Sequence, residues 1–364
     1  MHNRSTLTNL PFLLLFALAW ASAAQCAPDT NVASRVVDLD ETILVRGLDF
    51  SPDGTLLAAA SSFETINIWN WREKRVVRKL EKTAGASSGL TTRPMRFSPD
   101  GTYFATCHDG GKGEVVIRVW RTDTWAIVTD IGDPILGGCS AIDFTPDGQY
   151  LVRTTMRNPN RPACTLCIYS TRDWTLKRGL STIPFYPSAL AISPDGALIA
   201  MGGTSFQPSG SQTEEIRIVN TEDTGSVRVI PETMALHFGQ LSWSPDSKRL
   251  AAAGRRAWDG GANGGHGQFT GAPDNFAIFE VATGRKLSGE QWGKQVSRYS
   301  LAFSPDGRYL LEGGTDGSGV KIWDNQHMRL LQGIDVSAGS VSAARGGPYF
   351  AVGSEGKITV WKFE

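Results

Sequence analysis

The stretch Phe97-Ser98-Pro99-Asp100-Gly101 decides the fold, because close copies of this FSPDG phrase recur along the chain. In such a phrase proline presets φ, aspartate caps the turn backbone and glycine takes a positive φ, so each copy predicts a tight turn between two strands. Successive copies are 47, 47, 48, 51, 60 and 40 residues apart, near the length of a four-stranded repeat. The copies read FSPDG at 50–54, 97–101 and 303–307, FTPDG at 144–148, ISPDG at 192–196, WSPDS at 243–247 and AARGG at 343–347.

Apolar residues stand at fixed distances on both sides of every turn. One set lies three residues after the last turn residue: Leu57, Phe104, Leu151, Ile199, Leu250, Leu310 and Phe350. A second set lies two residues before the first residue of the phrase: Leu48, Met95, Ile142, Leu190, Leu241, Leu301 and Val341. Because every one of these positions is apolar, we expect a strand with a buried face on each side of each turn.

A third strand in each unit has its own signature. Its first and third positions are always apolar, whereas its second position varies among Asn, Arg, Cys, Ala, Lys and Thr. This period-two alternation predicts a strand with one buried face. The runs are INIW at 66–69, IRVW at 117–120, LCIY at 166–169, IRIV at 216–219, FAIF at 276–279, VKIW at 320–323 and ITVW at 358–361.

These turn phrases and third strands resemble the WD-repeat family, whose units end their third strand in Trp-Asp. The resemblance covers residues 34–364 and implies a seven-bladed β-propeller. The sequence departs from the family in two ways: Trp323-Asp324 is the one Trp-Asp pair that ends a third strand, and no unit opens with the Gly-His dipeptide. These departures put the family's buried hydrogen-bonding tetrad in question. The units with Val219 and Phe279 also resemble the Pro-Asp repeats of periplasmic propellers.

The last unit needs a strand from elsewhere in the chain. Its third strand ends close to Glu364, while Val36–Asp40 precedes the first unit and belongs to no blade of its own. If Val36–Asp40 supplies the missing outer strand, the ring closes without an open sheet edge in that blade. The sequence therefore predicts an all-β chain, a seven-bladed β-propeller whose N-terminal strand closes the last blade.

The N-terminus has the layout of a secretory signal peptide. A short basic start is followed by an apolar run at 11–20 and by small residues at 21–24, so we expect cleavage after Ala23 or one residue later. The run is short for a membrane anchor, which is the alternative. We thus expect a signal peptide at 1–23, a leader at 24–33 and the propeller at 34–364. The mature chain would be secreted or periplasmic, with no transmembrane segment.

Export implies an oxidising compartment in which disulfides persist. The chain has five cysteines: Cys26, Cys107, Cys139, Cys164 and Cys167. If Cys164–Cys167 is extended, residues three apart are too distant for a disulfide, so a local pair is possible only if Cys164 turns back in the loop. Cys107, Cys139 and Cys164 should all lie near the same end of two adjacent blades, and Cys139–Cys164 is the first pairing that we predict.

The overall charge excludes some classes of partner. The 36 basic and 36 acidic residues balance, whereas nucleic-acid binders show a clustered basic excess. The histidines show no metal-binding spacing, so we predict neither a metal nor a cofactor.

Long segments fall on one predicted face of the ring, opposite the tight turns. They lie between second and third strands, at 108–114, 155–165, 203–215 and 255–275, and between blades at 81–92 and 131–138. Insertions confined to one face usually mark the binding face. The candidate partner-binding residues there are Arg255, Arg256, Trp258, Asp259, His266 and Phe269, together with the cluster Arg153, Arg157 and Arg161. A solvated loop is the alternative interpretation of that basic cluster.

Charged residues also recur beside the predicted channel. Asp49, Arg96 and Asp143 occupy equivalent positions in three successive units, which predicts an arginine between two carboxylates. We therefore predict an exported scaffold that binds a protein, peptide or glycan through its long loops. The alternative is a lactonase-like or quinoprotein-like enzyme with a site at the channel mouth, where such propellers gather ligands for a metal or cofactor.

Overall fold

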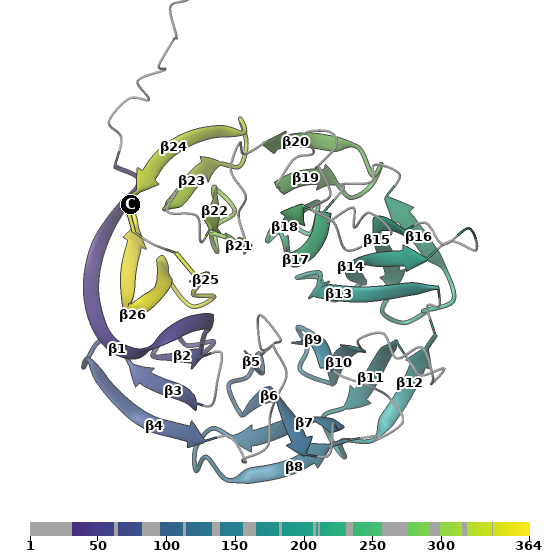
Figure 1. Cartoon of the computed structure of the whole chain (residues 1–364), viewed down its shortest axis with the longest axis horizontal. Coiled ribbons are helices and arrows are strands. Elements are labelled where there is room, and N and C mark those ends of the chain that lie inside the picture. The colour runs from purple at the N-terminus through teal and green to yellow at the C-terminus, as the bar shows by residue number, and fades with distance from the viewer. Residues whose placement is uncertain are drawn as a thin grey trace, which may run out of the picture.

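Figure 1 shows a closed ring of antiparallel sheets around a central axis. This computed structural model describes residues 31–61, 65–81, 95–111, 114–132, 139–155, 165–181, 184–206, 209, 212–230, 236–256, 276–290, 299–314, 319–336 and 338–364. Within these residues there is no helix, and 26 strands form seven blades. The prediction of an all-β, seven-bladed propeller is confirmed.

The chain builds its blades in order, and the first strand of each lies nearest the axis (Figure 1). Blade 1 holds the end of β1 (Ala33–Phe50), β2 (Leu56–Ser61), β3 (Thr65–Asn70) and β4 (Arg75–Glu81). Blade 2 holds β5 (Met95–Phe97), β6 (Tyr103–Gly111), β7 (Glu114–Arg121) and β8 (Ile127–Ile131). Blade 3 holds β9 (Cys139–Phe144), β10 (Tyr150–Thr155), β11 (Leu166–Ser170) and β12 (Leu176–Leu180).

The remaining blades follow the same plan. Blade 4 holds β13 (Phe185–Ile192), β14 (Leu198–Phe206), β15 (Gln212–Asn220) and β16 (Val227–Ile230). Blade 5 holds β17 (Leu236–Trp243), β18 (Arg249–Arg256), β19 (Phe276–Glu280) and β20 (Lys286–Glu290). Blade 6 holds β21 (Tyr299–Phe303), β22 (Tyr309–Gly314), β23 (Val320–Asp324) and β24 (Arg329–Ile334). Blade 7 holds β25 (Ser340–Ala343), β26 (Tyr349–Phe363) and the start of β1.

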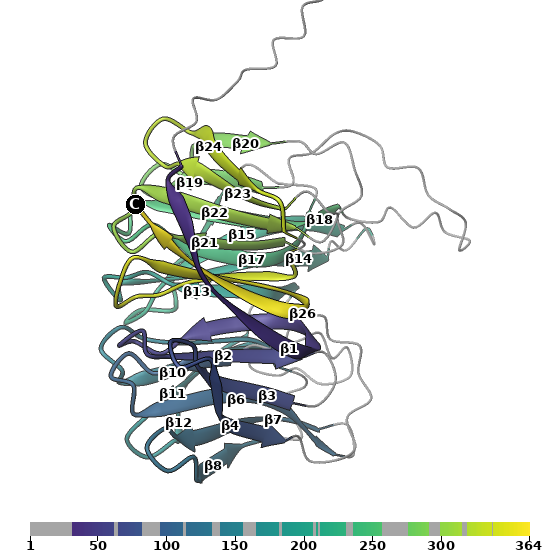
Figure 2. The ribbon, with the colours of Figure 1, turned by 90° about the vertical axis from the view of Figure 1, so that its left-hand side faces the viewer.

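The two ends of the described chain close the ring together. β1 is bent: Val37 and Leu39 pair with Val360 and Ile358 of β26, whereas Leu48 further along pairs with β2 of blade 1. Figure 2 shows β1 crossing the outside of the ring beside β26 before it turns inward. The expected role of Val36–Asp40 as the outer strand of the last blade is confirmed.

Every tight turn except the seventh is held by a serine or threonine and an aspartate, as blade 2 illustrates. The Ser98 hydroxyl donates to Asp100 at 2.5 Å and accepts from the Tyr103 amide at 2.8 Å, while Asp100 accepts from the Thr102 amide at 3.0 Å. Gly101 has a φ of 74°, in the left-handed region that glycine adopts without strain. The same hydroxyl-to-aspartate bond recurs at Ser51, Thr145, Ser193, Ser244 and Ser304.

The core lies between adjacent blades, so blade strands have two buried faces. The seven apolar residues that follow the turns, from Leu57 to Phe350, have no exposed surface. The expectation of one buried face is wrong for several third strands, because Cys167 and Ala277 at the variable second position are also fully buried. A neighbouring blade covers each face, and a small side chain at the second position fits against it.

Two segments predicted as irregular loops are mostly strand. Residues 108–111 and Glu114 continue the β6–β7 ladder, with Gly111 opposite Glu114. Residues 203–206 and 212–215 continue the β14–β15 ladder as far as Phe206 opposite Gln212. Both segments have the polar composition that is expected of a loop. Their described backbone is nevertheless paired, so these hairpins continue beyond the core.

Candidate functional site at the central channel

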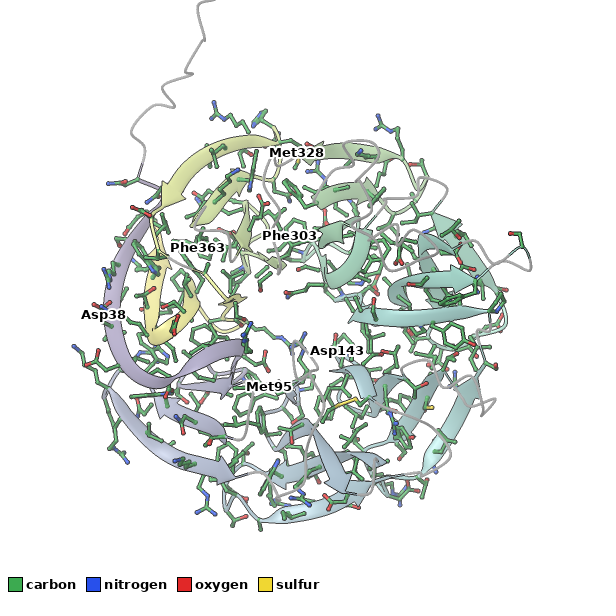
Figure 3. The ribbon with its side chains drawn as sticks, viewed as in Figure 1. Asp38, Met95, Asp143, Phe303, Met328 and Phe363 are labelled. Carbon is green, nitrogen blue, oxygen red and sulfur yellow. A yellow bond between two sulfur atoms is a disulfide. The ribbon has the colours of Figure 1, made fainter. Side chains whose placement is uncertain are left out.

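The seven blades enclose a cavity of about 480 Å³ at the end of the axis that carries the tight turns. Every blade contributes to its wall through the last residues of its inner strand or through its turn. Figure 3 places Asp143 and Phe303, two of these wall residues, near the central opening. A volume of this size is within the range of pockets that bind small ligands.

Turn prolines form much of the rim of this cavity. The rim prolines are Pro99, Pro146, Pro194, Pro245 and Pro305. Successive turns pack closely, since a Cβ on Gly101 would lie 3.8 Å from Pro52 of the preceding blade. In the seventh turn Arg345 stands at the proline position and also lines the cavity.

Asp49, Arg96 and Asp143 line the wall of this cavity together. The Arg96 Nε lies 3.5 Å from Asp143 Oδ1, and these side chains are 28% and 13% exposed. Asp49 Oδ2 accepts the Phe97 amide of blade 2 at 2.8 Å, and Asp143 Oδ2 accepts the Ile192 amide of blade 4 at 3.2 Å. Each carboxylate therefore both joins two blades and faces the channel.

Burial dominates the electrostatics of this charged group. Burial raises the pKa of the Asp49 carboxyl, and the opposing effects of Arg96, Arg345 and the Phe97 amide do not cancel it. Burial alone would lower the pKa of Arg96, but the carboxylates of Asp49 and Asp143 raise it. The guanidinium thus stays charged, whereas ionised Asp49 is incompletely compensated.

A smaller cavity of about 100 Å³ continues the channel toward the other face. Leu48, Arg96, Gln240 and Val341 line both cavities and so mark the passage between them. The Gln240 side chain donates to the Leu301 carbonyl at 2.9 Å and accepts from the Ser300 hydroxyl at 2.9 Å. The Ser300 hydroxyl in turn accepts the Val341 amide at 3.0 Å, so these side chains fasten blades 5, 6 and 7 to one another around the channel.

Most of the predicted partner-binding residues lie outside the described residues. These are Trp258, Asp259, His266, Phe269, Arg157 and Arg161. Arg255 and Arg256 end β18, but their side chains are outside the described part. The signal peptide predicted at 1–23 and most of the leader at 24–33 also lie outside it.

Arg153 differs from the exposed arginine that the sequence suggested. It lies within β10, between Ile142 of β9 and Cys167 of β11, and has no exposed surface. The structure therefore removes Arg153 from the predicted basic surface cluster. Thr106 and Glu312 occupy the equivalent position in blades 2 and 6, and both are buried as well.

Cys107 of β6 and Cys139 of β9 form a disulfide that joins blades 2 and 3. The predicted Cys139–Cys164 pair is therefore wrong, because the registers of two strands in different blades bring Cys107 to Cys139. Cys167 is also disulfide-bonded, while the two other cysteines, Cys26 and Cys164, lie outside the described residues.

Tryptophans that end third strands find varied acceptors in place of one repeated tetrad. The indole N–H of Trp69 donates to Glu41 at 3.0 Å, and that of Trp323 donates to Glu312 at 2.9 Å. Trp120 uses the Thr106 hydroxyl instead. Thr106 and Glu312 share one position of the second strand but differ in residue type, and Glu41 comes from β1, so no repeated motif marks these acceptors in the sequence.

The described residues form no helix that could span a membrane. They also hold no group of three or more His, Cys, Asp or Glu side chains able to bind a metal ion.

The closed ring of four-stranded blades defines the chain as a β-propeller. The family model for the WD domain, G-beta repeat, matches residues 39–70 and 285–324, which correspond to blade 1 and to the segment from β20 to β23. These matches cover two parts of the chain, and together with the seven blades they support a β-propeller of the WD-repeat type. Such a ring fits the general role of a protein-binding scaffold.

Several curated proteins are similar to this chain. SEC12-like protein 2 of Arabidopsis thaliana is 24% identical over 216 residues, which are 56% of this chain and 48% of that protein. WD repeat-containing protein 90 of Homo sapiens is 24% identical over 281 residues, 74% of this chain and 14% of that protein. Protein HIR1 of Cryptococcus neoformans is 25% identical over 119 residues, 31% of this chain and 12% of that protein. The matches thus span about half of the first relative's length and far less of the other two.

Proposed function

We propose that this chain is an exported binding protein that holds a protein, peptide or glycan partner on the face opposite its tight turns. The observation that carries the proposal is the segregation of connections in the ring. The turns after first strands are short and hydrogen-bonded, whereas the longest connection, residues 257–275, joins the far ends of β18 and β19. Ordered loops longer than about 12 to 15 residues are usually functional or disordered.

The composition of that connection suits a binding surface. It contains Trp258 just before a glycine-rich run and Phe269 near the end of that run, with Asp259 and His266 nearby. Aromatic side chains contribute much contact area for few frozen torsions, so they are favoured anchors at interfaces. The ring beneath is braced between blades by side chains such as Gln240, which gives such anchors a rigid base.

The disulfide between Cys107 and Cys139 supports the proposal of export. Disulfides persist in oxidising compartments and are rare in the cytosol. The test of export is the intact mass of the protein released by an exporting host. A chain that begins at Ala24 or one residue later supports the proposal, and a chain that keeps Met1–Ala23 contradicts it.

Capture from an extract of the exporting cell's envelope tests the binding face. The variant replaces residues 258–271 with an Asn-Gly turn, and Arg121→Ala serves as a control because its half-exposed side chain lies beside the turn that follows β7. We expect both variants to melt like the wild type, because an Asn-Gly turn can join two antiparallel strands and the Arg121 side chain is half-exposed. The loop variant should lose the partner and the control should keep it. Equal capture by both variants would place the binding surface elsewhere.

A further inference from the structure

The seventh turn departs from the repeat at Gly346 and at Arg345, and packing explains only the glycine. Its glycine at position 346 is required, because a Cβ there would lie 2.4 Å from the Pro52 carbonyl oxygen. Arg345 replaces the rim proline, yet its side chain is exposed at the mouth of the 480 Å³ cavity. Within the described part of the chain, no hydrogen bond or ion pair engages its guanidinium. Departures from a repeat without a packing cause are typical of functional positions.

Asp49 offers the complementary group inside the same cavity. Its Oδ2 accepts the Phe97 amide, while its Oδ1 accepts no hydrogen bond from the described residues. Arg345 is near enough for its charge to act on this carboxylate. The cavity therefore has an available acceptor inside and an available cation at its rim.

The charges in the wall of the larger cavity do not balance without the rim. Asp49 and Asp143 are negative when ionised, and Arg96 between them supplies a single positive charge. Arg345 offsets the remaining negative charge of the two carboxylates. Because its side chain is exposed, the solvent screens this interaction. A partly enclosed site focuses such a field, so the interior favours a cation and the rim favours an anion.

We propose that the turn-side mouth of the channel binds a small zwitterion, with the ammonium group at Asp49 and the carboxylate at Arg345. Free amino acids and short peptides share this chemistry, and the cavity volume suits either. The site lies on the face opposite the proposed partner-binding loops, so it goes beyond the proposed function and is tested without any partner.

Calorimetric titration of the purified full chain with a matched set of probes tests the proposal. The probes are γ-aminobutyrate, δ-aminovalerate and ε-aminocaproate, which separate the two charges by increasing distances, with pentylamine and pentanoate as single-charge references. We expect at least one ω-amino acid to bind about tenfold or more tightly than either reference, because it satisfies both groups. Diglycine and triglycine form a second arm: tighter binding of these indicates a peptide ligand, and tighter binding of the ω-amino acids indicates a free amino acid.

Two substitutions separate the contributions of the two groups. Arg345→Pro restores the residue of the other turns and should reduce the affinity of the best probe to that of pentylamine. Arg345→Gln is a second variant that removes the charge without constraining the backbone. Asp49→Asn keeps an acceptor for the Phe97 amide and should weaken every ammonium probe about tenfold. Arg121→Ala on the outer surface is the control and should bind like the wild type.

The proposal is wrong if no zwitterionic probe binds better than pentylamine and pentanoate. It is also wrong if both Arg345 variants bind the best probe as tightly as the wild type does. Either result concerns the channel site alone. The proposed function rests on the loops of the opposite face and has its own assay, so the two proposals can fail separately.

Discussion

Leu39 in β1 pairs with Ile358 in β26, so a residue near the start of the described chain lies directly opposite one near its end. Leu39 is 1% exposed, and it packs with Val360 and Trp69 in one core cluster that spans the last and first blades. The closure is thus a hydrophobic contact as well as a ladder of backbone hydrogen bonds.

Closure makes β1 sensitive to charge on its buried side. We expect Leu39→Asp to destabilise the ring by about 3 kcal/mol or more, because it buries an unpaired carboxylate. Val36→Asp is the matched control: Val36 is 47% exposed on the same strand, and its replacement should change the free energy of unfolding by less than about 0.5 kcal/mol. Urea denaturation measures both. Similar effects of the two substitutions would contradict the closing role of this strand.

Arg96 is expected to matter more at neutral than at acidic pH. Arg96→Met leaves Asp49 and Asp143 without the cation between them, which should cost about 2 to 3 kcal/mol at about pH 7.5. Arg96 lowers the pKa of Asp49, so its loss raises that pKa further above the unfolded value. The folded variant then gains stability as pH falls, and the defect should shrink toward about pH 4.5.

Urea denaturation at the two pH values tests this dependence. The control is Arg75→Met, which removes the exposed pair with Glu73 and should change stability by less than about 0.5 kcal/mol. A defect of Arg96→Met that is equal at both pH values would show that lost packing, and not charge, is responsible.

The turn aspartates predict a second pH dependence of opposite sign. Burial alone would raise the pKa of Asp100, but hydrogen bonds from Ser98 and Thr102 lower it below the ordinary value of 3.8. Its ionised form therefore stabilises the fold at neutral pH, and this contribution is lost as pH falls below about 4. Asp53, Asp195, Asp246 and Asp306 have lowered pKa values for the same kind of reason.

Asp100→Asn isolates this contribution, because the amide oxygen still accepts hydrogen bonds but carries no charge. It should cost about 0.5 to 1 kcal/mol at neutral pH and progressively less as pH falls below about 4. Asp335→Asn, on an exposed side chain outside the turns, is the control. If the difference between Asp100→Asn and wild type is constant with pH, the turn charge does not contribute.

The disulfide between Cys107 and Cys139 should stabilise the ring substantially. It closes a separation of 32 residues, for which the chain-entropy model gives about 3.7 kcal/mol. The variant Cys107→Ala with Cys139→Ala should lose about that amount in urea denaturation. A non-reducing peptide map of the wild type should contain the linked pair. Equal stability of variant and wild type would mean that the bond is not formed.

The repeat determined how much of this fold could be predicted. Proline, aspartate and glycine act locally, so the turns and the strands beside them follow from the phrase itself, and an unpaired strand at 36–40 can close only the incomplete blade. The length of the strands at 203–215 could not be predicted, since polar residues suit a loop and also a hairpin that extends beyond the core. The Cys107–Cys139 pair depends on the register between two blades, which no local pattern encodes.

The channel site likewise has residues that could be identified from the sequence and residues that could not. Asp49, Arg96 and Asp143 were visible as equivalent positions in successive repeats, and they share one cavity wall. Arg345 was visible only as a departure from proline, and its place at the rim needs the ring. Arg153 was misread because an arginine near a loop is usually exposed, whereas a blade strand here is covered on both faces.

The affinity of the purified ring for its purified partner tests the central claim most directly. Kd is measured for the wild type, for the variant with Asn-Gly in place of residues 258–271, and for Arg345→Pro on the opposite face. The account predicts at least about 100-fold weaker binding by the loop variant, equivalent to the loss of a few interface anchors, and an unchanged Kd for Arg345→Pro. An unchanged Kd for the loop variant would contradict it.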